Sequence, residues 1–531
     1  MISSRIAAGI DYTHREDGDL CRRSECVAFA TIPLGFRTNN RTNFFDYTLD
    51  ANVAATYALT PALRATTTVG LQYFQSLFDR NGASASDLPP NATTVSSGAI
   101  PSVSESSDES KTLGAFIEQQ FALRQRLFVT AALRRDDNSA FGADFSAVYY
   151  PKLGVSYVIS EESFFPRPAW LNNLRLRGAL GASGTQPNVT DAIRFFTPTT
   201  ASVDAVDRGA IVFSAIGNPT LKPERATELE LGFDASALRN RLSVDFTYYR
   251  KRTRDALIAR IVAPSAGAAT TRFENLGSVQ NTGIEMLLSA QVLDRPTFGW
   301  DLTLTAATNH NKILELGVPP IIGTTVQQRE GFPIDGWWQR PYTYSDANGN
   351  GIIEASEIVV EDSAAYIGPS IPTREITVIT GFDLFRRRFR VTGLFDHKGG
   401  RYQLNGTERI RCESRLNCDG LVDPTASFER QARVVALRET AARTQYGFIE
   451  RADFWRFREL AITYNMPPGM ARMMRANSGT VTLAARNLFL SSDYTGLDPE
   501  SAYFSGNTGI QSDFQTAPPP TFWTLRVNFG F

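Results

Sequence analysis

The sequence predicts an all-β fold, a transmembrane antiparallel β-barrel, and three observations support this. Segments of about ten residues carry apolar side chains at every second position, and a tilted strand of that length crosses the hydrocarbon of a bilayer. The connections between these segments are alternately short and long, as in barrels with tight turns on one side of the membrane. The sequence contains no run of about 18 apolar residues, so it predicts no membrane-spanning helix.

The last segment, 521–531, shows the pattern most clearly. Successive side chains of a strand point to opposite faces, so residues two apart share a face. Here one face is apolar and the other polar: Trp523, Leu525, Val527, Phe529 and Phe531 against Thr524, Arg526 and Asn528. The first face suits lipid and the second suits water.

The same period predicts about sixteen strands along the chain. Good examples of the alternation are Ile2/Ser4/Ile6, Leu127/Val129/Ala131, Leu229/Leu231/Phe233, Leu242/Val244/Phe246, Ile284/Met286/Leu288, Trp300/Leu302/Leu304 and Ile376/Val378/Thr380. The predicted ranges are 2–12, 44–58, 65–74, 113–123, 126–135, 147–159, 173–182, 227–237, 241–250, 282–293, 298–309, 374–384, 387–397, 454–466, 479–488 and 521–531.

The connections predict which end of the barrel faces outward. If the last strand ends in the periplasm, the tight turns lie inside, at 124–125, 238–240, 294–297 and 385–386, with longer inner links at 160–172 and 467–478. The long links then lie outside the cell: 13–43, 75–112, 136–146, 183–226, 251–281, 310–373, 398–453 and 489–520. We expect 310–373 and 398–453 to be long extracellular loops, the second with a short amphipathic helix around 429–443.

Composition fits one large architecture. The chain has 531 residues without a Pro/Ser linker, and the whole range 1–531 is read as one barrel region. Lys and Arg total 54 against 55 Asp and Glu, without a basic stripe, so nucleic acid is not an expected partner.

The four cysteines form two pairs that are close in sequence. Cys21 and Cys26 fall in one predicted outer loop, and Cys412 and Cys418 in another. An oxidising exterior favours two local disulfides. Free thiols are the alternative, and zinc is disfavoured because neither pair has the C-x2-C spacing.

Several stretches resemble TonB-dependent outer-membrane receptors. "NPTLKPERATELELGF" (218–233) and "NLGSVQNTGIEM" (275–286) are similar to the later part of such barrels in general. "RRDDNSAFG", "LRLRGALGASGTQP", "FWRFRELAITYNMP" and "RNLFLSSDYTGLDPE" are similar to the SusC/RagA-like branch. The resemblance implies import of glycans or peptides, a SusD-like surface lipoprotein as partner, and a barrel of about 22 strands. It also implies that the aromatic C-terminal residue, Phe531, is recognised during barrel assembly.

The resemblance also implies an N-terminal plug and a TonB-contacting segment, which residues 1–531 do not match. Met1 leads directly into the alternating segment 2–12, without a charged n-region and apolar h-region for export. We therefore interpret the chain as a fragment, the C-terminal part of a receptor, that meets the TonB complex only through the missing N-terminal part. Closure of a barrel by sixteen strands alone stays open.

The segment 346–357 fits the calcium-loop pattern D-x-[DN]-x-[DN]-G-x5-E. Calcium takes six to eight oxygen ligands, which here would come from the side chains of Asp346, Asn348, Asn350 and Glu357, the carbonyl of Ile352 and a water at Glu354, with Gly351 at the tight turn. Two neutral ligands predict weak Ca²⁺ binding that stiffens a loop. The alternative is a solvated Asn/Gly turn without an ion.

Four aromatic residues precede this segment: Trp337, Trp338, Tyr342 and Tyr344. They could stack on sugar rings or hold a partner lipoprotein, or they could pack the loop. Catalysis finds no support, because His14, His310 and His397 lack metal-ligand spacing and no nucleophile, zinc or phosphate-loop motif is present.

The sequence therefore predicts a multi-pass outer-membrane protein in contact with lipid, part of a SusC/RagA-like TonB-dependent importer and not an enzyme. A passive porin is the alternative within transport. A secreted β-rich glycan-binding or adhesion protein is the alternative from another class, and it would dissolve without detergent.

Overall fold

The computed structural model describes residues 1–26, 34–142, 147–166, 168–263, 271–501 and 512–531. Sixteen strands form one antiparallel sheet. In order of pairing they are β1 (Ile2–Cys21), β2 (Phe36–Thr60), β3 (Leu63–Ser86), β4 (Ile100–Leu123), β5 (Leu127–Asn138), β6 (Val148–Val158), β7 (Leu171–Thr185), β10 (Glu224–Ala237), β11 (Leu242–Ile261), β12 (Thr271–Asp294), β13 (Phe298–Glu315), β20 (Arg374–Leu384), β21 (Phe389–Gly399), β24 (Phe454–Asn465), β25 (Ser478–Ser492) and β27 (Phe522–Gly530).

Each of the sixteen predicted ranges falls on one of these strands, so the predicted strand count and order are confirmed. The predicted ends at the long connections are wrong for several strands. β1 runs on to Cys21, β4 begins at Ile100, and β13 ends at Glu315. The prediction stopped where the apolar alternation stopped. Backbone pairing continues through polar sequence, as between β3 and β4 from Ser76↔Ser110 to Ser84↔Ser102.

The chain divides into two compact units, which we describe separately. Unit 1 holds residues 1–155, 179–227 and 253–276, and unit 2 holds 156–178, 228–252 and 277–531. Unit 1 contains the long strands β1 to β4, the shorter β5, and a separate two-stranded ribbon, β8 (Phe195–Val203) and β9 (Val206–Ala215). Its one disulfide joins Cys21 to Cys26, with the Cα atoms 5.3 Å apart.

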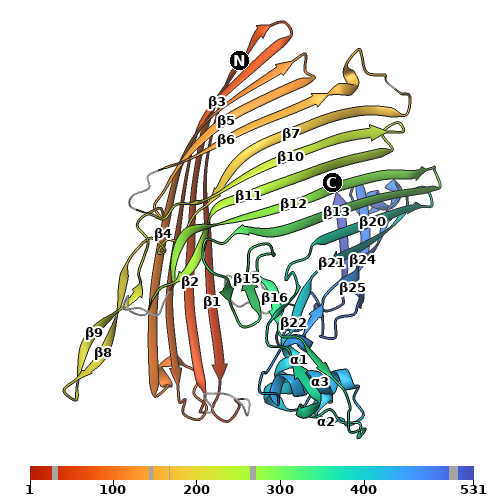
Figure 1. The fold of residues 1–531 in the computed structure, drawn as a ribbon. Coiled ribbons are helices and arrows are strands. Elements are labelled where there is room, and N and C mark those ends of the chain that lie inside the picture. The colour runs from red at the N-terminus through yellow and green to blue at the C-terminus, as the bar shows by residue number, and fades with distance from the viewer. Residues whose placement is uncertain (27–33, 143–146, 167, 264–270, 502–511) are drawn as a thin grey trace. The chain divides into compact units, whose positions relative to one another are not determined.

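Unit 2 combines strands with a group of small elements drawn from its long connections (Figure 1). These are β14 (Ile321–Ile322), β15 (Val326–Gln328), β16 (Gly336–Gln339), β17 (Tyr342–Tyr344), η4 (Ala355–Glu357), β18 (Ile358–Val360), β19 (Ala365–Gly368), β22 (Tyr402–Asn405), α1 (Gly406–Ile410), η5 (Arg411–Arg415), α2 (Asp419–Val422), α3 (Phe428–Arg438), η6 (Tyr446–Phe448), β23 (Ile449–Arg451) and β26 (Ser512–Asp513). We call this group the lobe. The remaining short helices are η1 (Val95–Ser97), η2 (Ile159–Glu161) and α4 (Pro468–Met473).

The strands carry their apolar side chains on an exposed face. Leu229 and Leu231 of β10 are 38% and 50% exposed, and Trp523 and Leu525 of β27 are 67% and 69% exposed. The opposite face carries charges in cross-strand pairs. Arg177 of β7 bonds to Asp234 and Asp245, and Arg390 of β21 to Asp301 and Asp383. Side chains exposed on an apolar face suit contact with lipid, and the paired charges suit a polar interior.

Tight turns join the strands at one end of unit 2. The turn between β20 and β21 places Phe385, Arg386 and Arg387 at positive φ of 52°, 61° and 62°. The turn between β10 and β11 is similar, with Leu238, Arg239 and Asn240 at positive φ. A short turn without positive φ joins β12 to β13, and α4 lies in the longer link between β24 and β25. The alternation of short and long connections is thus present as predicted, with the lobe at the opposite end of these strands (Figure 1).

Candidate functional site

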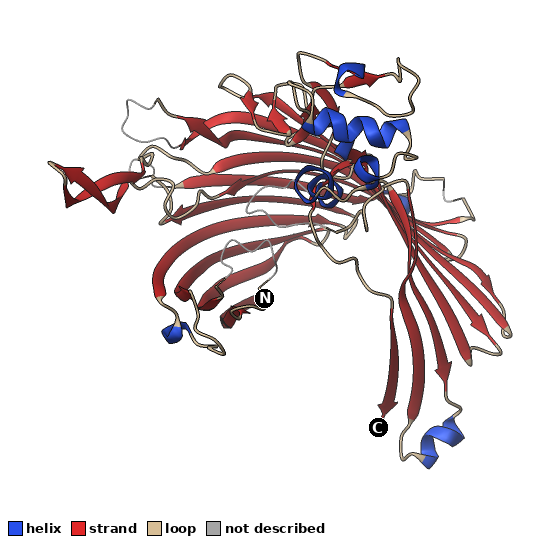
Figure 2. Ribbon diagram, turned by 90° about the horizontal axis from the view of Figure 1, so that it is seen from below, coloured by secondary structure: helices blue, strands red, loops and turns tan. Residues whose placement is uncertain are grey.

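The lobe brings together connections that are far apart in sequence. β22 pairs with β23 antiparallel and with β26 in parallel, so residues near 404, 449 and 512 form one small sheet. Helix α3 begins at its N-cap Ser427, whose side chain accepts the Arg430 N–H, and Figure 2 shows it grouped with the other helices of the lobe. The predicted helix around 429–443 is confirmed but shorter, since it ends at Arg438.

Two small hydrophobic cores hold α3 in place. Its Ala432, Val435 and Ala436 pack against Ile353 and Ile358 from the connection between β13 and β20. Val434 and Leu437 pack against the second core, which contains Cys412, Cys418 and Phe448. Because α3 is apolar on two sides, it joins its own connection, between β21 and β24, to the connection between β13 and β20.

The predicted calcium segment, 346–357, curls back on itself. The Asp346 carboxylate accepts the N–H groups of Asn350 at 3.1 Å and of Gly351 at 3.0 Å. The Oε1 atom of Glu357 accepts the N–H of Asn348 at 3.2 Å, and Oε2 accepts that of Glu354 at 3.0 Å. Gly351 has a φ of +81°, a conformation that strains other residues. The side chains at the two ends of the pattern therefore point into the same short loop.

The oxygens of Asn348 and Asn350 take part in the same loop. Asn348 Oδ1 accepts the Asn350 N–H at 2.9 Å, and Asn350 Oδ1 accepts the Ile352 N–H at 2.7 Å. The Asn350 amide also donates to Glu354 at 3.3 Å. The side-chain groups that the pattern assigns to calcium are thus gathered around the backbone of one turn.

Gln431 of α3 ties this segment to the rest of the lobe. Its Oε1 accepts the N–H of Ile353 at 2.9 Å, and its Nε2 donates to the carbonyls of Gly351 at 3.2 Å and Ala426 at 2.9 Å. Gln431 is 4% exposed, so these bonds are made away from water. The position of the segment therefore depends on helix α3.

The aromatic residues beside this segment differ in accessibility. Trp337 is completely buried and donates from Nε1 to the Tyr402 carbonyl at 2.8 Å. Trp338 is 6% exposed, lies edge-on to Phe332, and has the Arg329 guanidinium over its ring. Neither indole is open to a solute or a partner. Their burial favours the alternative that these two residues pack the loop.

The two tyrosines lie nearer the surface of the lobe. Tyr342 packs against the first hydrophobic core, and burial raises the pKa of its phenol. Tyr344 is 39% exposed. Of the four predicted contact residues, Tyr344 alone is exposed. Tyr366, beside Trp338, is also half-buried, and burial together with the charge of Tyr402 raises its pKa to about 12.

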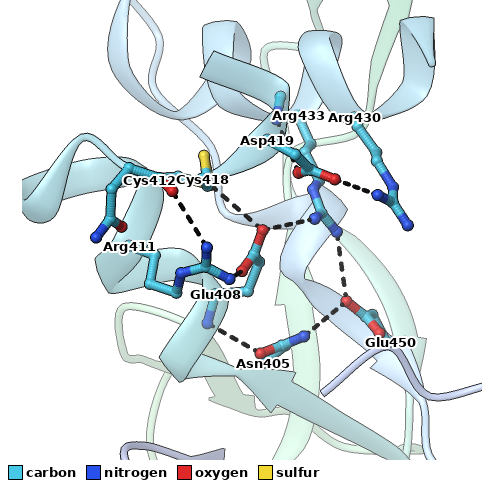
Figure 3. Close-up of a disulfide and its surroundings, with 11 residues drawn as sticks. Asn405, Glu408, Arg411, Cys412, Cys418, Asp419, Arg430, Arg433 and Glu450 are labelled. Carbon is cyan, nitrogen blue, oxygen red and sulfur yellow. Dashed lines mark hydrogen bonds and ion pairs between the residues drawn. A yellow bond between two sulfur atoms is a disulfide. The ribbon is translucent and has the colours of Figure 1, made fainter. Parts of the chain in front are cut away.

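The lobe disulfide joins Cys412 to Cys418, whose Cα atoms are 5.0 Å apart, and both cysteines are buried (Figure 3). Glu408 lies close to both sulfur atoms. A disulfide offers no thiolate, so these three residues do not form a metal centre in this state. Glu408 instead pairs with Arg433 at 3.2 Å, and Arg433 pairs with Glu450 at 3.6 Å.

A buried ion network fixes the connection between β25 and β27 to β24, and it was not predicted. Arg456 bonds both oxygens of Asp498 at 2.7 Å and lies 2.8 Å from Glu500. Arg458 bonds Asp396 and Glu500. Burial acts to raise the pKa of Glu500, but the bond from Arg458 and the charges of both arginines outweigh it and lower that pKa. In the sequence, only the arginines at alternate positions of "FWRFREL" hint at this network.

Two further buried polar residues were also missed. Arg401 is 2% exposed and donates to the carbonyls of Ala452 and Pro499. Asp513 is completely buried and accepts hydrogen bonds from Thr407 and Tyr494. Pro499 lies 98 residues from Arg401 and Thr407 lies 106 residues from Asp513, so no local pattern reveals these partners.

The three histidines lie within strands: His14 in β1, His310 in β13 and His397 in β21. His397 is 8% exposed, its Nδ1 lies 2.6 Å from the Phe454 carbonyl, and its ring stacks on Trp455. This is a structural environment and not a catalytic one.

None of the helices in the described parts of the chain is both long enough and apolar enough to cross a membrane.

Comparison with known proteins identifies the family. The model of the TonB dependent receptor-like β-barrel matches residues 4–488. The chain belongs to this family. The chain, which we call the receptor barrel after this family, is therefore an outer-membrane protein that crosses the membrane with its strands. The family is one of receptors and transporters, not of enzymes.

Two curated relatives are similar along most of the receptor barrel. TonB-dependent receptor P26 of Formosa agariphila is 25% identical over 463 residues, 77% of this chain and 45% of the relative. TonB-dependent receptor SusC of Bacteroides thetaiotaomicron is 22% identical over 445 residues, 77% of this chain and 42% of the relative. The chain thus spans about half the length of the curated relatives that it matches.

A solved structure shows the same fold. The RagAB peptide transporter superposes with a TM-score of 0.81 at 19% sequence identity, over 100% of this chain and 60% of the other. The predicted SusC/RagA-like resemblance is therefore confirmed for the fold of the receptor barrel.

Proposed function

We propose that the receptor barrel is part of a TonB-dependent importer that takes up a glycan or a peptide through the outer membrane. The family match carries this proposal, and the paired charges on the polar face of the strands support it. The likeness to a peptide transporter supports the peptide class, and the glycan class comes from the resemblance of the sequence to the SusC/RagA-like branch. We place the lobe outside the cell and the tight turns in the periplasm, following the lengths of the connections. Contact with the TonB complex would be made by residues outside the barrel.

Uptake in cells tests this proposal. Cells that produce the protein are compared with a strain lacking its gene, using labelled oligopeptides and oligosaccharides, with and without an uncoupler of the proton gradient. We expect uptake of one class to require the gene and to stop with the uncoupler. Uptake that persists with the uncoupler would instead identify a passive porin.

We also propose that a SusD-like lipoprotein covers the lobe. Several aliphatic side chains on its surface are exposed, among them Ile322, Val359 and Val422 at 69%, 67% and 61%. Exposed apolar groups of this kind are typical of a binding surface. Co-purification of the lipoprotein from membranes should be lost in Val359→Asp with Val422→Asp and kept in the matched variant Val103→Asp with Val212→Asp in unit 1.

For the segment 346–357 we propose weak binding of Ca²⁺ by Asp346, Asn348, Asn350, Glu357 and the Ile352 carbonyl. The converging side chains and the positive φ of Gly349 and Gly351 support this. Calcium is expected to slow hydrogen exchange at residues 346–357 in the purified protein. Glu357→Gln should remove this effect, and Glu439→Gln, on the exposed surface of the lobe, should retain it. Exchange that calcium leaves unchanged would identify an ion-free turn.

A further inference from the structure

Four neighbouring turns at one end of unit 2 carry positive charge without acidic residues. They are 238–241, 295–297, 385–388 and 466–477, and together we call them the arginine rim. They contain eight arginines and no Asp or Glu, although the whole chain has 54 basic and 55 acidic residues. The eight are Arg239, Arg241, Arg295, Arg386, Arg387, Arg388, Arg472 and Arg475. Such a local excess is not explained by overall composition.

The turns of the rim are neighbours in space because their strands pair in succession, from β10 to β25. The N–H of Gln291, next to the second turn, bonds to the Arg241 carbonyl of the first at 2.7 Å. Asn465, next to the fourth turn, bonds from its amide group to the Arg387 carbonyl of the third at 2.8 Å. The rim is therefore continuous, and Figure 1 shows the β12–β13 and β20–β21 turns at the ends of the strands opposite to the lobe.

Nearly all of this charge lacks an acidic partner among the residues that the structure describes. The eight arginines are exposed. Among the described residues, only Arg387 makes an ion pair, to Asp294 at 2.6 Å. The nearest acidic connection is 159–170, which carries Glu161 and Glu162, and both have interactions of their own. The other seven guanidinium groups have no ion pair with any described residue, so they are available to an external anion.

Exposed apolar side chains stand among these arginines. Phe385 is 69% exposed, Met473 87% and Leu238 53%. Between the first turn and β12 lies a groove of about 610 Å³, lined by Trp170, Leu238, Arg239, Arg241 and Val292 among others. Arginine over apolar surface, with aromatic residues beside it, is typical of the layer between hydrocarbon and headgroups.

We propose that the arginine rim binds the phosphate groups of anionic phospholipids. The rim lies where strands with an exposed apolar face end, so lipid headgroups are the anions at that level. Guanidinium groups bind phosphate oxygens through two parallel hydrogen bonds. The apolar groove would accept part of an acyl chain. The inference rests on the outer-membrane location and the proposed orientation of the barrel, which place the rim at the periplasmic leaflet, and it does not depend on the transported solute.

The test measures lipid binding to the full 531-residue chain, purified in a neutral detergent, by native mass spectrometry. Phosphatidylglycerol is compared with phosphatidylcholine of the same chain length. We expect phosphatidylglycerol to bind at least tenfold more tightly, since a cluster of basic residues favours an anionic membrane surface. Added salt should reduce the preference. Equal binding of the two lipids would overturn the proposal, as would complete displacement by inorganic phosphate at the lipid concentration, which would indicate a site for free phosphate.

Variants locate the site. Arg239→Gln, Arg386→Gln and Arg388→Gln together remove three unpaired charges from the rim. The control, Arg23→Gln, Arg254→Gln and Arg443→Gln, removes three exposed charges elsewhere. The rim variant should lose most of the preference for phosphatidylglycerol, and the control should keep it within twofold. A rim variant that binds like the control would contradict the proposal. If the rim variant does not fold, the salt and lipid comparisons on the unmodified chain still decide. Solute uptake does not enter this test, so the two proposals fail separately.

Discussion

Gln431 is the residue through which helix α3 holds the segment 346–357. It satisfies the N–H of Ile353 and the carbonyl of Gly351 at a buried position. Replacing it with Leu leaves both backbone groups unpaired. We expect Gln431→Leu to lower the free energy of opening of this segment by about 1–3 kcal/mol.

Hydrogen exchange at the Ile353 amide measures this loss directly. Gln445→Leu is the control, because Gln445 also lies in the lobe but its side chain is not bonded to the segment 346–357. If both variants exchange at the same rate, Gln431 does not hold the segment.

Glu500 makes the attachment of the connection between β25 and β27 depend on pH. Its pKa in the folded protein lies below the ordinary value of 4.5, because the bond and charge from Arg458 and the charge of Arg456 outweigh the effect of burial. The unfolded chain therefore takes up protons at a higher pH than the folded one. The stabilising contribution is fully present above about pH 4.5 and is lost as pH falls through the folded pKa.

We predict that residues 493–501 gain hydrogen exchange as pH is lowered through this window, after correction for intrinsic exchange rates. Glu500→Gln should lower the free energy of opening at neutral pH by about 1–3 kcal/mol and flatten its pH dependence. Glu439→Gln, at an exposed position, serves as control. A pH profile of Glu500→Gln that matches the unmodified protein would contradict the assignment.

Residue types alone could not predict these contacts. The alternating arginines of β24 are visible in the sequence, but their partners Asp498 and Glu500 lie 42 residues further on. Trp337 and Trp338 are residue types that are common on binding surfaces. In the structure they are buried, because other parts of the lobe cover them. Local patterns specify which side chains can bind, and only the tertiary structure decides which are exposed.

At the scale of the element, the strands were predictable because their pattern is local. The range 374–384 coincides with β20. The extension of β13 from residue 309 to 315 was missed because its apolar alternation ends while backbone pairing continues, at Gln280↔Lys312 and Val279↔Ile313. The calcium-loop pattern was recognisable for the same reason, since its residues lie within one turn of chain.

The same alternation predicts how β10 responds to substitution. Leu231 lies mid-strand on the exposed apolar face, and Glu230 lies on the opposite face. We expect Leu231→Arg to destabilise the membrane-inserted form by about 2–4 kcal/mol, because a charge at the midplane of a bilayer is costly. Glu230→Arg should cost much less, since it exchanges one charge for another in a polar interior.

Folding into phosphatidylcholine vesicles across a urea series measures both variants. If Leu231→Arg and Glu230→Arg lose equal stability, the assignment of the two faces is wrong for this strand.

At the scale of the whole molecule, the lobe depends on contacts between distant parts of the chain. Gln403 bonds the Ser501 carbonyl across 98 residues, and Thr444 bonds the Arg340 carbonyl across 104. Contacts of this kind form late, because the intervening chain must first be ordered. We predict that during refolding into detergent micelles the lobe becomes resistant to protease after the strands of unit 2. Resistance of the lobe before the strands would contradict this order.

The small sheet of β22, β23 and β26 makes the lobe sensitive to how the neighbouring strands are aligned. Its three strands come from the connection between β21 and β24 and from the one between β25 and β27. A slip of one residue between β24 and β25 would turn every side chain of one strand to the other face and would shift β26 away from its partner. An antibody that recognises the lobe only when β26 is paired with β22 would therefore count the molecules on a cell surface that were inserted in the correct register.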